Sequence, residues 1–494
     1  MTNTAPLKDE LSCLFREFIH SEYVIDDDET LKPYECDGLS MYTQLPMLVV
    51  LPETVEQVQK VLKICHEKQV PVVARGAGTG LAAGAMPHAE GVVLSLAKFN
   101  NILSIDPINR SARLQPGVRN LAISEAAKMY GLYYGPDPSS QIACTIGGNV
   151  AENSGGVHCL KYGLTVHNLL SVDLLTVEGE RITIGSDGLD SCGMDLLALI
   201  TGSEGLLGIV IEVQVKLLPI PETARVVMAG FGNVQQCGEA VSGIIAKGII
   251  PGGLEMMDSY AISASEDYAK AGYPLDAAAL LLCEVDGTKE EVQAHIEEVQ
   301  GLFKSFGATS IRTSQSEEER ALLWFGRKAA FPAVGRISPD YYCMDGTIPR
   351  SQLAYVLTEM QKMSERYDLK IANVFHAGDG NLHPLILFDA NVPGEFEKAE
   401  AFGGEILELC VAVGGCITGE HGVGIEKIRQ MIVQFSDEEL AQFHAIKDAF
   451  DPQGTLNPGK GVPTLKRCQE YRVLQSAKER SLGSINESGA HNHV

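Results

Sequence analysis

The chain has 494 residues, of which 45% are hydrophobic and 21% are charged, as is typical of a soluble globular protein. Its 64 acidic and 39 basic side chains give a formal net charge of −25, which argues against sequence-independent binding to nucleic acid. The length exceeds that of one ordinary hydrophobic core, so we expect two or three domains.

The N-terminal sequence, MTNTAPLKDELSCLF, lacks the basic segment and following apolar run of a secretory signal. No run of about 18 apolar residues is present that could span a bilayer. The 12 cysteines occur singly, without a CxxC pair, so the sequence predicts neither a zinc ribbon nor an iron–sulfur motif. We therefore expect a cytoplasmic protein with reduced thiols.

In chain order, the sequence divides into four parts. Residues 1–41 predict an N-terminal helix and an acidic connector. Residues 42–221 alternate short β-rich segments with glycine-rich loops, and the two prolines of LPIPET mark the end of this domain. Residues 222–460 alternate longer amphipathic helices with strands, which predicts an α+β domain with helices on a sheet. The polar tail, 461–494, is expected to be partly disordered.

The first segment that carries chemistry is VPVVARGAGTGLAAGAMP, residues 70–87, where glycines follow an apolar strand directly. Glycine lets backbone N–H groups approach a pyrophosphate without interference from a Cβ atom. The spacing is G-x-G-x-G, which differs from the Rossmann fingerprint, and no G-K-[ST] of a Walker loop follows. By itself, this pattern is equally typical of a flexible loop.

Two further glycine clusters favour a cofactor. GPDPSSQIACTIGGNVAENSGGVHCLKYG, residues 135–163, has little apolar periodicity, and a loop of this length in a compact domain is usually functional. TGSEGLLGIVIEV, residues 201–213, again places glycines against a strand. Three such loops in one domain predict an extended, backbone-rich binding surface for a large cofactor.

These segments carry a family resemblance. RGAGTGLAAGA, PDPSSQIACTIGGNVAENSGG, KYG and GSEGLLGIV resemble the FAD-binding domain of the vanillyl-alcohol oxidase/PCMH superfamily. VFHAGDGNLHP, TGEHGVGIEK and FDPQGTLNPGK resemble the FAD-linked oxidase C-terminal domain. Over about residues 40–460 they are similar to the glycolate oxidase D-subunit and D-lactate dehydrogenase branch, with RISPDYYCMDGTIPR most similar to the former. The resemblance implies an α+β fold with a two-subdomain PCMH-type FAD-binding domain, 42–221, before an α+β C-terminal domain, 222–460.

The resemblance also implies which residues contact FAD. The first loop would surround the pyrophosphate, the second would line the flavin, and the third would contribute to the isoalloxazine and adenosine side. The expected cofactor-binding residues are Arg75, Gly76, Ala77, Gly78, Thr79, Gly80, Leu81, Pro136, Asp137, Pro138, Ser139, Thr145, Gly147, Gly148, Asn149, Asn153, Gly155, Gly156, Tyr162, Gly163, Gly202, Glu204, Gly205, Gly208, Ile209, Val210 and Asn457. Relatives with covalent flavin often carry a histidine in the first loop, and its absence here predicts non-covalent FAD.

VFHAGDGNLHPLILF, residues 374–388, places a histidine on each side of AGDGN. Its Asp-Gly pair is a hairpin signal, so we predict a strand, a turn and a strand that bring His376 and His383 together. With Glu420 as a third ligand, two imidazoles and a carboxylate predict a divalent metal, Zn, Fe or Mn. The alternative is that both histidines bond the backbone of the turn.

His421 follows Glu420 in TGEHGVGIEK, and in the resembling enzymes the histidine of this motif is the proposed general base. A metal-bound 2-hydroxy acid would lose its hydroxyl proton to His421, near its usual pKa of about 6.5, as a hydride leaves for the flavin. Alternatively, His421 only supports the metal ligands. Arg327 matches the family's position for the substrate carboxylate. Cys343 stands where relatives with larger substrates have a lysine, which favours glycolate or D-lactate over 2-hydroxyglutarate.

The resemblance implies oxidation of a small 2-hydroxy acid to a 2-oxo acid. Electrons would pass to a quinone, to oxygen, or to a second flavin-type subunit and an iron–sulfur subunit. The chain would reach the inner face of the membrane only through such partners. One alternative is a D-lactate or D-2-hydroxyglutarate dehydrogenase that acts alone. Alternatives of other classes are a flavin-dependent transferase of the alkyl-dihydroxyacetonephosphate synthase type, which calls for basic residues absent near the motifs, and a non-catalytic flavin-binding subunit, which predicts loss of motifs that are intact here.

Overall fold

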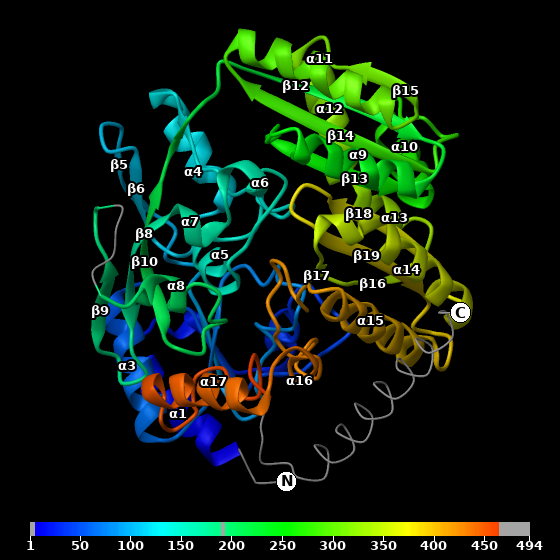
Figure 1. Cartoon of the computed structure of the whole chain (residues 1–494). Coiled ribbons are helices and arrows are strands. Elements are labelled where there is room, and N and C mark those ends of the chain that lie inside the picture. Colours follow the sequence, from blue (N-terminus) through cyan, green and yellow to red (C-terminus); the bar gives the residue numbers. More distant parts are fainter. Residues whose placement is uncertain (1–4, 189–192, 464–494) are drawn as a thin grey trace.

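The computed structural model describes residues 5–188 and 193–463, which form an α+β fold (Figure 1). Strands β1 to β11 build three small sheets in the N-terminal half, and the strands from β12 onward build one large sheet. The α+β class predicted from the sequence is therefore confirmed. Most of the predicted tail, 464–494, lies outside the described residues.

The first sheet has the strand order β1-β2-β4-β3 and consists of short runs rich in valine. Its strands are β1 (Val24–Ile25), β2 (Leu48–Val50), β4 (Val92–Ser95) and β3 (Val72–Arg75). The last three are parallel and almost completely buried, as expected for a parallel sheet covered on both faces. Helix α3 (Val55–Glu67), which begins at a capping box on Thr54, connects β2 to β3. Before β2 lie α1 (Ala5–Arg16), η1 (Ser21–Tyr23), α2 (Asp28–Leu31) and η2 (Lys32–Tyr34).

The second sheet has the order β5-β6-β10-β8-β9, and its neighbouring strands are antiparallel. Its strands are β5 (Ile102–Asp106), β6 (Ser111–Leu114), β10 (Ile209–Lys216), β8 (Leu169–Leu175) and β9 (Arg181–Gly185). Along β10, buried and partly exposed side chains alternate, as the two-residue period of a strand requires. A third sheet pairs β7 (Leu132–Tyr133) with β11 (Leu218–Pro219). The helices here are α4 (Asn120–Ala127), η3 (Lys128–Tyr130), α5 (Ile146–Glu152), α6 (Cys159–Tyr162), α7 (Thr165–Asn168) and α8 (Leu196–Ile200).

The large sheet has the order β15-β12-β14-β13-β18-β19-β16, with β17 also paired to β19. Its strands are β12 (Thr223–Phe231), β13 (Gly253–Asp258), β14 (Ala279–Gly287), β15 (Ala308–Thr313), β16 (Asp340–Cys343), β17 (Gly346–Thr347), β18 (Ile371–His376) and β19 (Asn381–Phe388). Helices cover both faces of this sheet. Alternate side chains of its strands point to opposite faces and therefore enter two separate cores. Along β12, for example, Val227 and Ala229 enter one core while Val226 and Met228 enter the other.

The helices that cover this sheet fall into two groups. The first core contains buried residues of α9 (Val234–Ala246), α11 (Lys289–Ser305), α14 (Leu353–Tyr367) and α15 (Glu395–Ala412). The second contains residues of α10 (Ser259–Ala269), α12 (Glu317–Lys328) and α13 (Ala330–Val334). The remaining helices of this half are η4 (Arg350–Gln352), α16 (Met431–Gln434) and α17 (Asp437–Phe450).

After α17 the chain returns to the N-terminal half. Leu456 forms a parallel bridge with Val72 of β3, and the backbone N–H of Asn457 donates to the Val72 carbonyl at 2.8 Å. Segments almost 400 residues apart in sequence are thereby joined at the strand that leads into the first glycine-rich loop.

A buried charge network connects the two halves of the molecule through His158. Its Nδ1 lies 2.9 Å from Asp137 Oδ2, and its Nε2 lies 3.0 Å from Glu284 Oε1 on β14. Arg320 of α12 also donates to Glu284, at 2.7 Å. Burial alone would lower the pKa of His158, but the two carboxylates outweigh burial and raise the pKa to about 10. His158 is therefore protonated at neutral pH and pairs with an acid from each half.

Replacing His158 with Phe should destabilise the fold, because it leaves two buried carboxylates without their shared cation. We expect the free energy of unfolding to fall by about 3 kcal/mol at neutral pH, measured by denaturant titration. Since the folded pKa is raised above the unfolded value of about 6.5, the stabilisation is complete below that pH and is lost as the pH rises through about 10. The matched control is His295→Phe on α11, outside this network. Equal stability of the two variants would contradict the prediction.

Candidate active site

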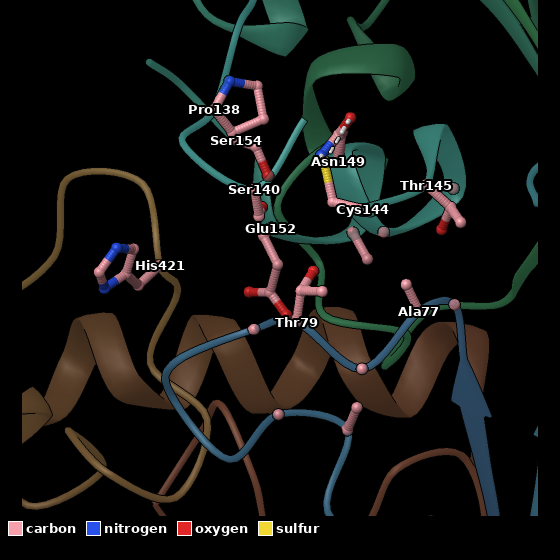
Figure 2. A pocket seen from close by; sticks show the side chains of 18 of the residues that line it. Ala77, Thr79, Pro138, Ser140, Cys144, Thr145, Asn149, Glu152, Ser154 and His421 are labelled. Carbon is pink, nitrogen blue, oxygen red and sulfur yellow. Dashed lines mark hydrogen bonds between the residues drawn. The ribbon is translucent and has the colours of Figure 1, made fainter. Parts of the chain in front are cut away.

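One cavity of about 520 Å³ lies where the glycine-rich loops of the N-terminal half meet the C-terminal half (Figure 2). Its lining combines backbone from all three glycine-rich loops with side chains from α12, α13, β19 and the GEHG segment. This size is in the range of small-molecule and cofactor sites.

Of the residues predicted to contact a cofactor, most line this cavity. They are Arg75, Gly76, Ala77, Gly78, Thr79, Gly80, Leu81, Pro138, Ser139, Thr145, Gly147, Gly148, Asn149, Glu204, Gly205, Gly208, Ile209 and Val210. The structure does not bring the others to its wall: Pro136, Asp137, Asn153, Gly155, Gly156, Tyr162, Gly163, Gly202 and Asn457. Several of these hold the loops in place. Asn457 Nδ2, for instance, donates to the carbonyls of Gly84 and Glu204, at 3.0 and 2.7 Å, and so ties the first loop to the third.

Some glycines of the cavity wall are needed because the backbone there lies too close to neighbouring groups for a Cβ atom. Gly78 has a φ of +67°, and a Cβ atom there would overlap the guanidinium of Arg75. A Cβ on Gly147 would lie 2.6 Å from Pro116. At Gly148, by contrast, a Cβ would have only Thr145 Oγ1 near it, at 3.5 Å, so a side chain there has room to project within the cavity lining. The cavity size and this backbone-rich lining fit a dinucleotide cofactor such as FAD.

The two histidines of residues 374–388 converge as predicted. β18 ends at His376, a turn follows, and β19 begins at Asn381, so the predicted strand, turn and strand are confirmed. His383 pairs with Val374, two residues before His376 on the neighbouring strand, so both imidazoles share one face. Their ring centroids are 4.9 Å apart and the rings are perpendicular.

Glu420 completes a donor set with these histidines. Its Oε1 lies 3.2 Å from His376 Nε2 and 3.0 Å from His383 Nε2, and these ligand atoms all lie within 4.8 Å of one another. The other nitrogen of His376, Nδ1, lies 2.8 Å from Glu255, and the backbone N–H of Gly155 donates to Glu420 Oε2 at 2.9 Å. Imidazole ligands of metals usually have such a carboxylate on their second nitrogen. Two imidazoles and a carboxylate with these supports fit a divalent metal.

Arg327 and Lys328 are neighbours in sequence but occupy different environments. Arg327 is 1% exposed, and its Nη2 lies 2.5 Å from Glu255 Oε2, on the far side of that carboxylate from His376. The structure thus places Arg327 behind the metal-type donor set and not among the cavity-lining residues. Lys328 lines the cavity, with its Nζ 3.3 Å from Asp137 Oδ2. It lies close to Phe331 and Pro332, which line the same wall.

His421 stacks on His383, with ring centroids 5.0 Å apart and an angle of 14° between the rings. Its side chain therefore projects differently from that of Glu420, as expected, and it lines the cavity. Its Nδ1 is buried without a hydrogen-bond partner. Burial lowers the pKa of His421 to about 4, below the 6.5 assumed from the sequence, so its imidazole is neutral at physiological pH.

Two buried carboxylates, Asp345 and Glu204, hold the GEHG segment; sequence reasoning did not single out Asp345 and gave Glu204 only a cofactor-binding role. Asp345 accepts backbone N–H groups of Gly419, at 3.0 Å, and His421, at 2.9 Å, and also pairs with Lys427 at 3.2 Å. Although burial raises the pKa of Asp345, the positive charges of His421, when it is protonated, and of Lys427 lower it below its usual value, so Asp345 is ionised. Asp345 directly follows Cys343-Met344 in the sequence. Only its burial and its hydrogen bonds to the GEHG backbone reveal this role.

Glu204 holds the same segment from the N-terminal half. Its two carboxylate oxygens accept the backbone N–H groups of Val423 and Gly424, both at 2.7 Å. Nearby, Glu152 lines the cavity beside Thr79 (Figure 2), and burial together with the Glu204 charge raises its pKa well above the usual value. Sequence reasoning did not single out Glu152, although it lies inside the motif AENSGG.

The cavity thus combines a glycine-rich wall that fits a dinucleotide with two histidines and a carboxylate, as expected for a flavin-dependent oxidoreductase. The sequence matches the family descriptions "FAD binding domain" over residues 46–185 and "FAD linked oxidases, C-terminal domain" over residues 220–461. The chain belongs to the FAD-linked oxidase family, and the resemblance inferred from its motifs is confirmed.

Several curated proteins are similar to this chain over most of its length. Glycolate oxidase subunit GlcD of Escherichia coli K12 is 62% identical over 459 residues, which cover 93% of this chain and 92% of that protein. The Bacillus subtilis protein of the same name is 41% identical, covering 86% and 91%. D-lactate dehydrogenase of Anaerostipes hadrus is 31% identical, covering 90% and 96%.

Solved structures share the fold. p-Cresol methylhydroxylase with substrate bound has a TM-score of 0.80 at 18% identity, with coverage of 94% of this chain and 98% of that chain. An alkyldihydroxyacetonephosphate synthase has a TM-score of 0.71 at 19% identity, with coverage of 90% and 84%. At these identities the likeness concerns the fold alone. Within residues 5–188 and 193–463, no helix is long and apolar enough to cross a membrane.

A side chain at Gly148 should exclude FAD without disturbing the protein, because a Cβ there meets only Thr145. We expect Gly148→Val to lose most of its flavin absorbance relative to protein, with an unchanged circular dichroism spectrum. The control is Gly301→Val on α11, where a Cβ meets nothing within 4 Å and full flavin content is expected. Acid precipitation of wild type should release the flavin into the supernatant, as a non-covalent cofactor requires; flavin in the pellet, or full flavin in Gly148→Val, would refute these expectations.

Proposed function

We propose that this chain oxidises a small 2-hydroxy acid, glycolate or D-lactate, to the corresponding 2-oxo acid as the FAD-dependent subunit of a glycolate oxidase. The names of the similar proteins, glycolate oxidase subunit and D-lactate dehydrogenase, support this substrate class. The observation that carries the proposal is that a single cavity joins the glycine-rich loops to His383, Glu420 and His421. The glycine-rich loops would hold FAD, which would supply a two-electron acceptor for the reaction.

His376, His383 and Glu420 would hold a divalent metal, Zn, Fe or Mn. Such an ion supplies positive charge that lowers the pKa of a substrate hydroxyl. The three side chains are almost fully buried and are fixed from behind by Glu255 and by the backbone of Gly155. This fixed geometry favours one orientation of the substrate hydroxyl relative to His421.

His421 would accept the hydroxyl proton. Its imidazole is neutral at physiological pH, lines the cavity and has a buried Nδ1 without a partner, so a nitrogen lone pair is open to a donor. Asp345 accepts the backbone N–H of this residue, and its negative charge favours the imidazolium that forms. The stacking on His383 keeps the ring next to the metal-type donor set.

The substrate carboxylate needs a cation at the cavity wall. Lys328 lines the cavity and shares its charge with Asp137 only at 3.3 Å, which leaves its ammonium able to bind a second acid. The family position for this role, Arg327, is held by Glu255 in the structure, and its participation remains a prediction. Cys343 in place of a second cation supports a substrate with a single carboxylate, glycolate or D-lactate.

Electrons would leave through partner proteins. The relatives are named as subunits of glycolate oxidase, and this chain has no CxxC pair for its own iron–sulfur centre. We propose a second flavin-type subunit and an iron–sulfur subunit as partners, with cytoplasmic location and membrane association through them. Similarity of fold to alkyldihydroxyacetonephosphate synthase does not favour a transferase, because that likeness is limited to the fold.

The proposal predicts that substrate reduces the bound flavin in the absence of oxygen. Glycolate or D-lactate should bleach the flavin absorbance of the purified protein, whereas L-lactate and 2-hydroxyglutarate should be slower. His421→Ala should retain FAD but bleach about 100-fold or more slowly, because it lacks the proton acceptor. His295→Ala on α11 serves as the control and should match wild type.

Two results would count against this proposal. Absence of bleaching with every hydroxy acid would reject the substrate class. Bleaching of His421→Ala at the wild-type rate would reject the proton-acceptor role while leaving the substrate class intact.

Metal dependence gives a separate prediction. After desalting, wild type should retain a divalent ion by elemental analysis, and His376→Ala should not, because two donors rather than three remain. Removal of the ion from wild type with a chelator should slow flavin bleaching, and adding back Mn²⁺, or one equivalent of Zn²⁺, should restore it. Full activity of chelated, metal-free wild type would disprove the metal site.

A further inference from the structure

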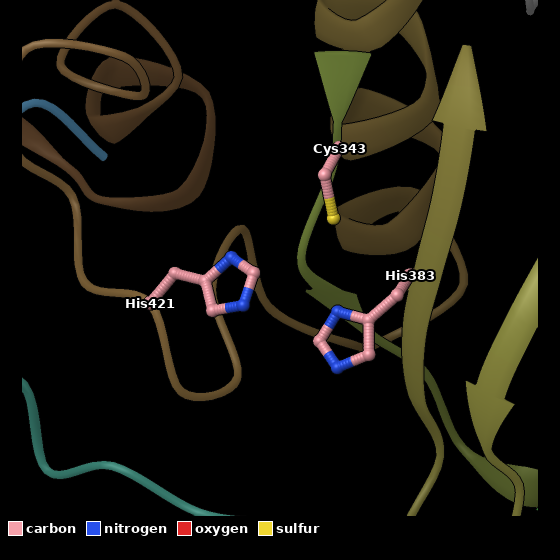
Figure 3. A group of neighbouring side chains, drawn as sticks. All are labelled: Cys343, His383 and His421. Carbon is pink, nitrogen blue, oxygen red and sulfur yellow. The ribbon is translucent and has the colours of Figure 1, made fainter. Parts of the chain in front are cut away.

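A second convergence of ligand atoms shares His383 with the metal-type donor set and adds Cys343, which the proposed reaction does not use. One ligand atom each of Cys343, His383 and His421 lies within 4.8 Å of the other two (Figure 3). Cys343 ends β16 and is 3% exposed, and His383 on β19 is 2% exposed. Figure 3 shows the Cys343 sulfur pointing toward the two imidazole rings.

His383 can serve both groups because its two nitrogens have different neighbours. Nε2 lies 3.0 Å from Glu420 Oε1, in the first donor set. Nδ1 lies 3.4 Å from the carbonyl of Met344, the residue after Cys343, and 4.0 Å from Asp345. The ring therefore lies next to both donor sets without moving, and binding of metals to both nitrogens at once would release its remaining N–H proton to solvent and leave a bridging imidazolate.

Side chains without a strong hydrogen-bond partner at this position favour a cation. His421 Nδ1 is buried without a hydrogen-bond partner, and imidazole nitrogens are common ligands of divalent metals. The Cys343 thiol has only a weak hydrogen bond, to the carbonyl of its neighbour Met344 at 3.4 Å. A cation can enter through the cavity, since His383 and His421 both line it.

We propose that Cys343, His383 and His421 form a second, inhibitory metal site for a thiophilic divalent cation, Zn²⁺ or Cd²⁺. The Cys343 thiol loses its proton to solvent as the sulfur–metal bond forms, and the oxidation state of the metal does not change. One thiolate and two imidazoles are a preferred donor set for these ions. Hard cations such as Mg²⁺ and Mn²⁺ do not compensate for ionising a thiol in this buried environment, so the site excludes them.

Occupation of this site would withdraw His421 from proton transfer. A nitrogen lone pair that binds a metal cannot accept a proton, so the flavin of a Cd²⁺-loaded protein would no longer be reduced by substrate at the normal rate. This consequence depends on the function proposed above, whereas the binding of the cation does not. Binding and inhibition are therefore measured separately.

The binding test is titration of the flavin-loaded protein with Cd²⁺, followed by the ultraviolet charge-transfer absorption of a cadmium–thiolate bond. Wild type should develop this absorption, and Cys343→Ala and Cys343→Ser should not. Cys237→Ala is the matched control, because Cys237 is fully buried in α9 away from this site, and it should behave as wild type. His376→Ala should also keep the absorption, since it removes one ligand of the first donor set and none of the second.

The inhibition test compares flavin bleaching by glycolate with and without Cd²⁺. Bleaching of wild type should slow by on the order of 100-fold, the size expected for loss of a general base. Cys343→Ala should bleach at the same rate with Cd²⁺ as without it. Mn²⁺ should inhibit neither protein. Equal absorption changes in wild type and both Cys343 variants would overturn the proposed site, even if no hydroxy acid reduces the flavin. Binding at Cys343 without inhibition would overturn the proposed effect on His421.

Discussion

The candidate active site depends on the attachment of the GEHG segment to both halves of the molecule. Asp345 accepts its backbone N–H groups from the C-terminal half, and Glu204 accepts those of the next two residues from the N-terminal half. Both carboxylates are buried, so each hydrogen bond replaces lost hydration. Because Glu420 and His421 lie in this segment, contacts from both halves of the molecule fix the positions of these two side chains.

This attachment places two chemistries on opposite walls of one cavity. Glycine-rich backbone from the N-terminal half supplies stretches of wall without side chains, where a large cofactor can lie close to the chain. His383 of the large sheet, with Glu420 and His421 of the GEHG segment, lines the same cavity. The His158 network and the return of the chain to β3 join the same two halves elsewhere, so their relative position does not depend on one loop.

Buried charge in this acidic protein is arranged in chains rather than in isolated pairs. Arg327 contacts Glu255, Glu255 contacts His376, and His376 contacts Glu420, with each group offsetting the desolvation of the next. Such a chain orients the imidazole by its second nitrogen. In this chain Arg327 is buried against Glu255, while the adjacent Lys328 lines the cavity.

The sequence by itself determined the α+β class, the three glycine-rich loops, and the strand, turn and strand around His376 and His383, because these depend on local spacing and backbone preference. It also indicated Glu420 and His421, through a family motif. Only the tertiary structure decided that Asp345 and Glu204 hold that motif, that Lys328 rather than Arg327 lines the cavity, and that Cys343 meets two histidines. These outcomes depend on contacts between distant segments and on burial, and neither is encoded in the spacing of residues along the chain.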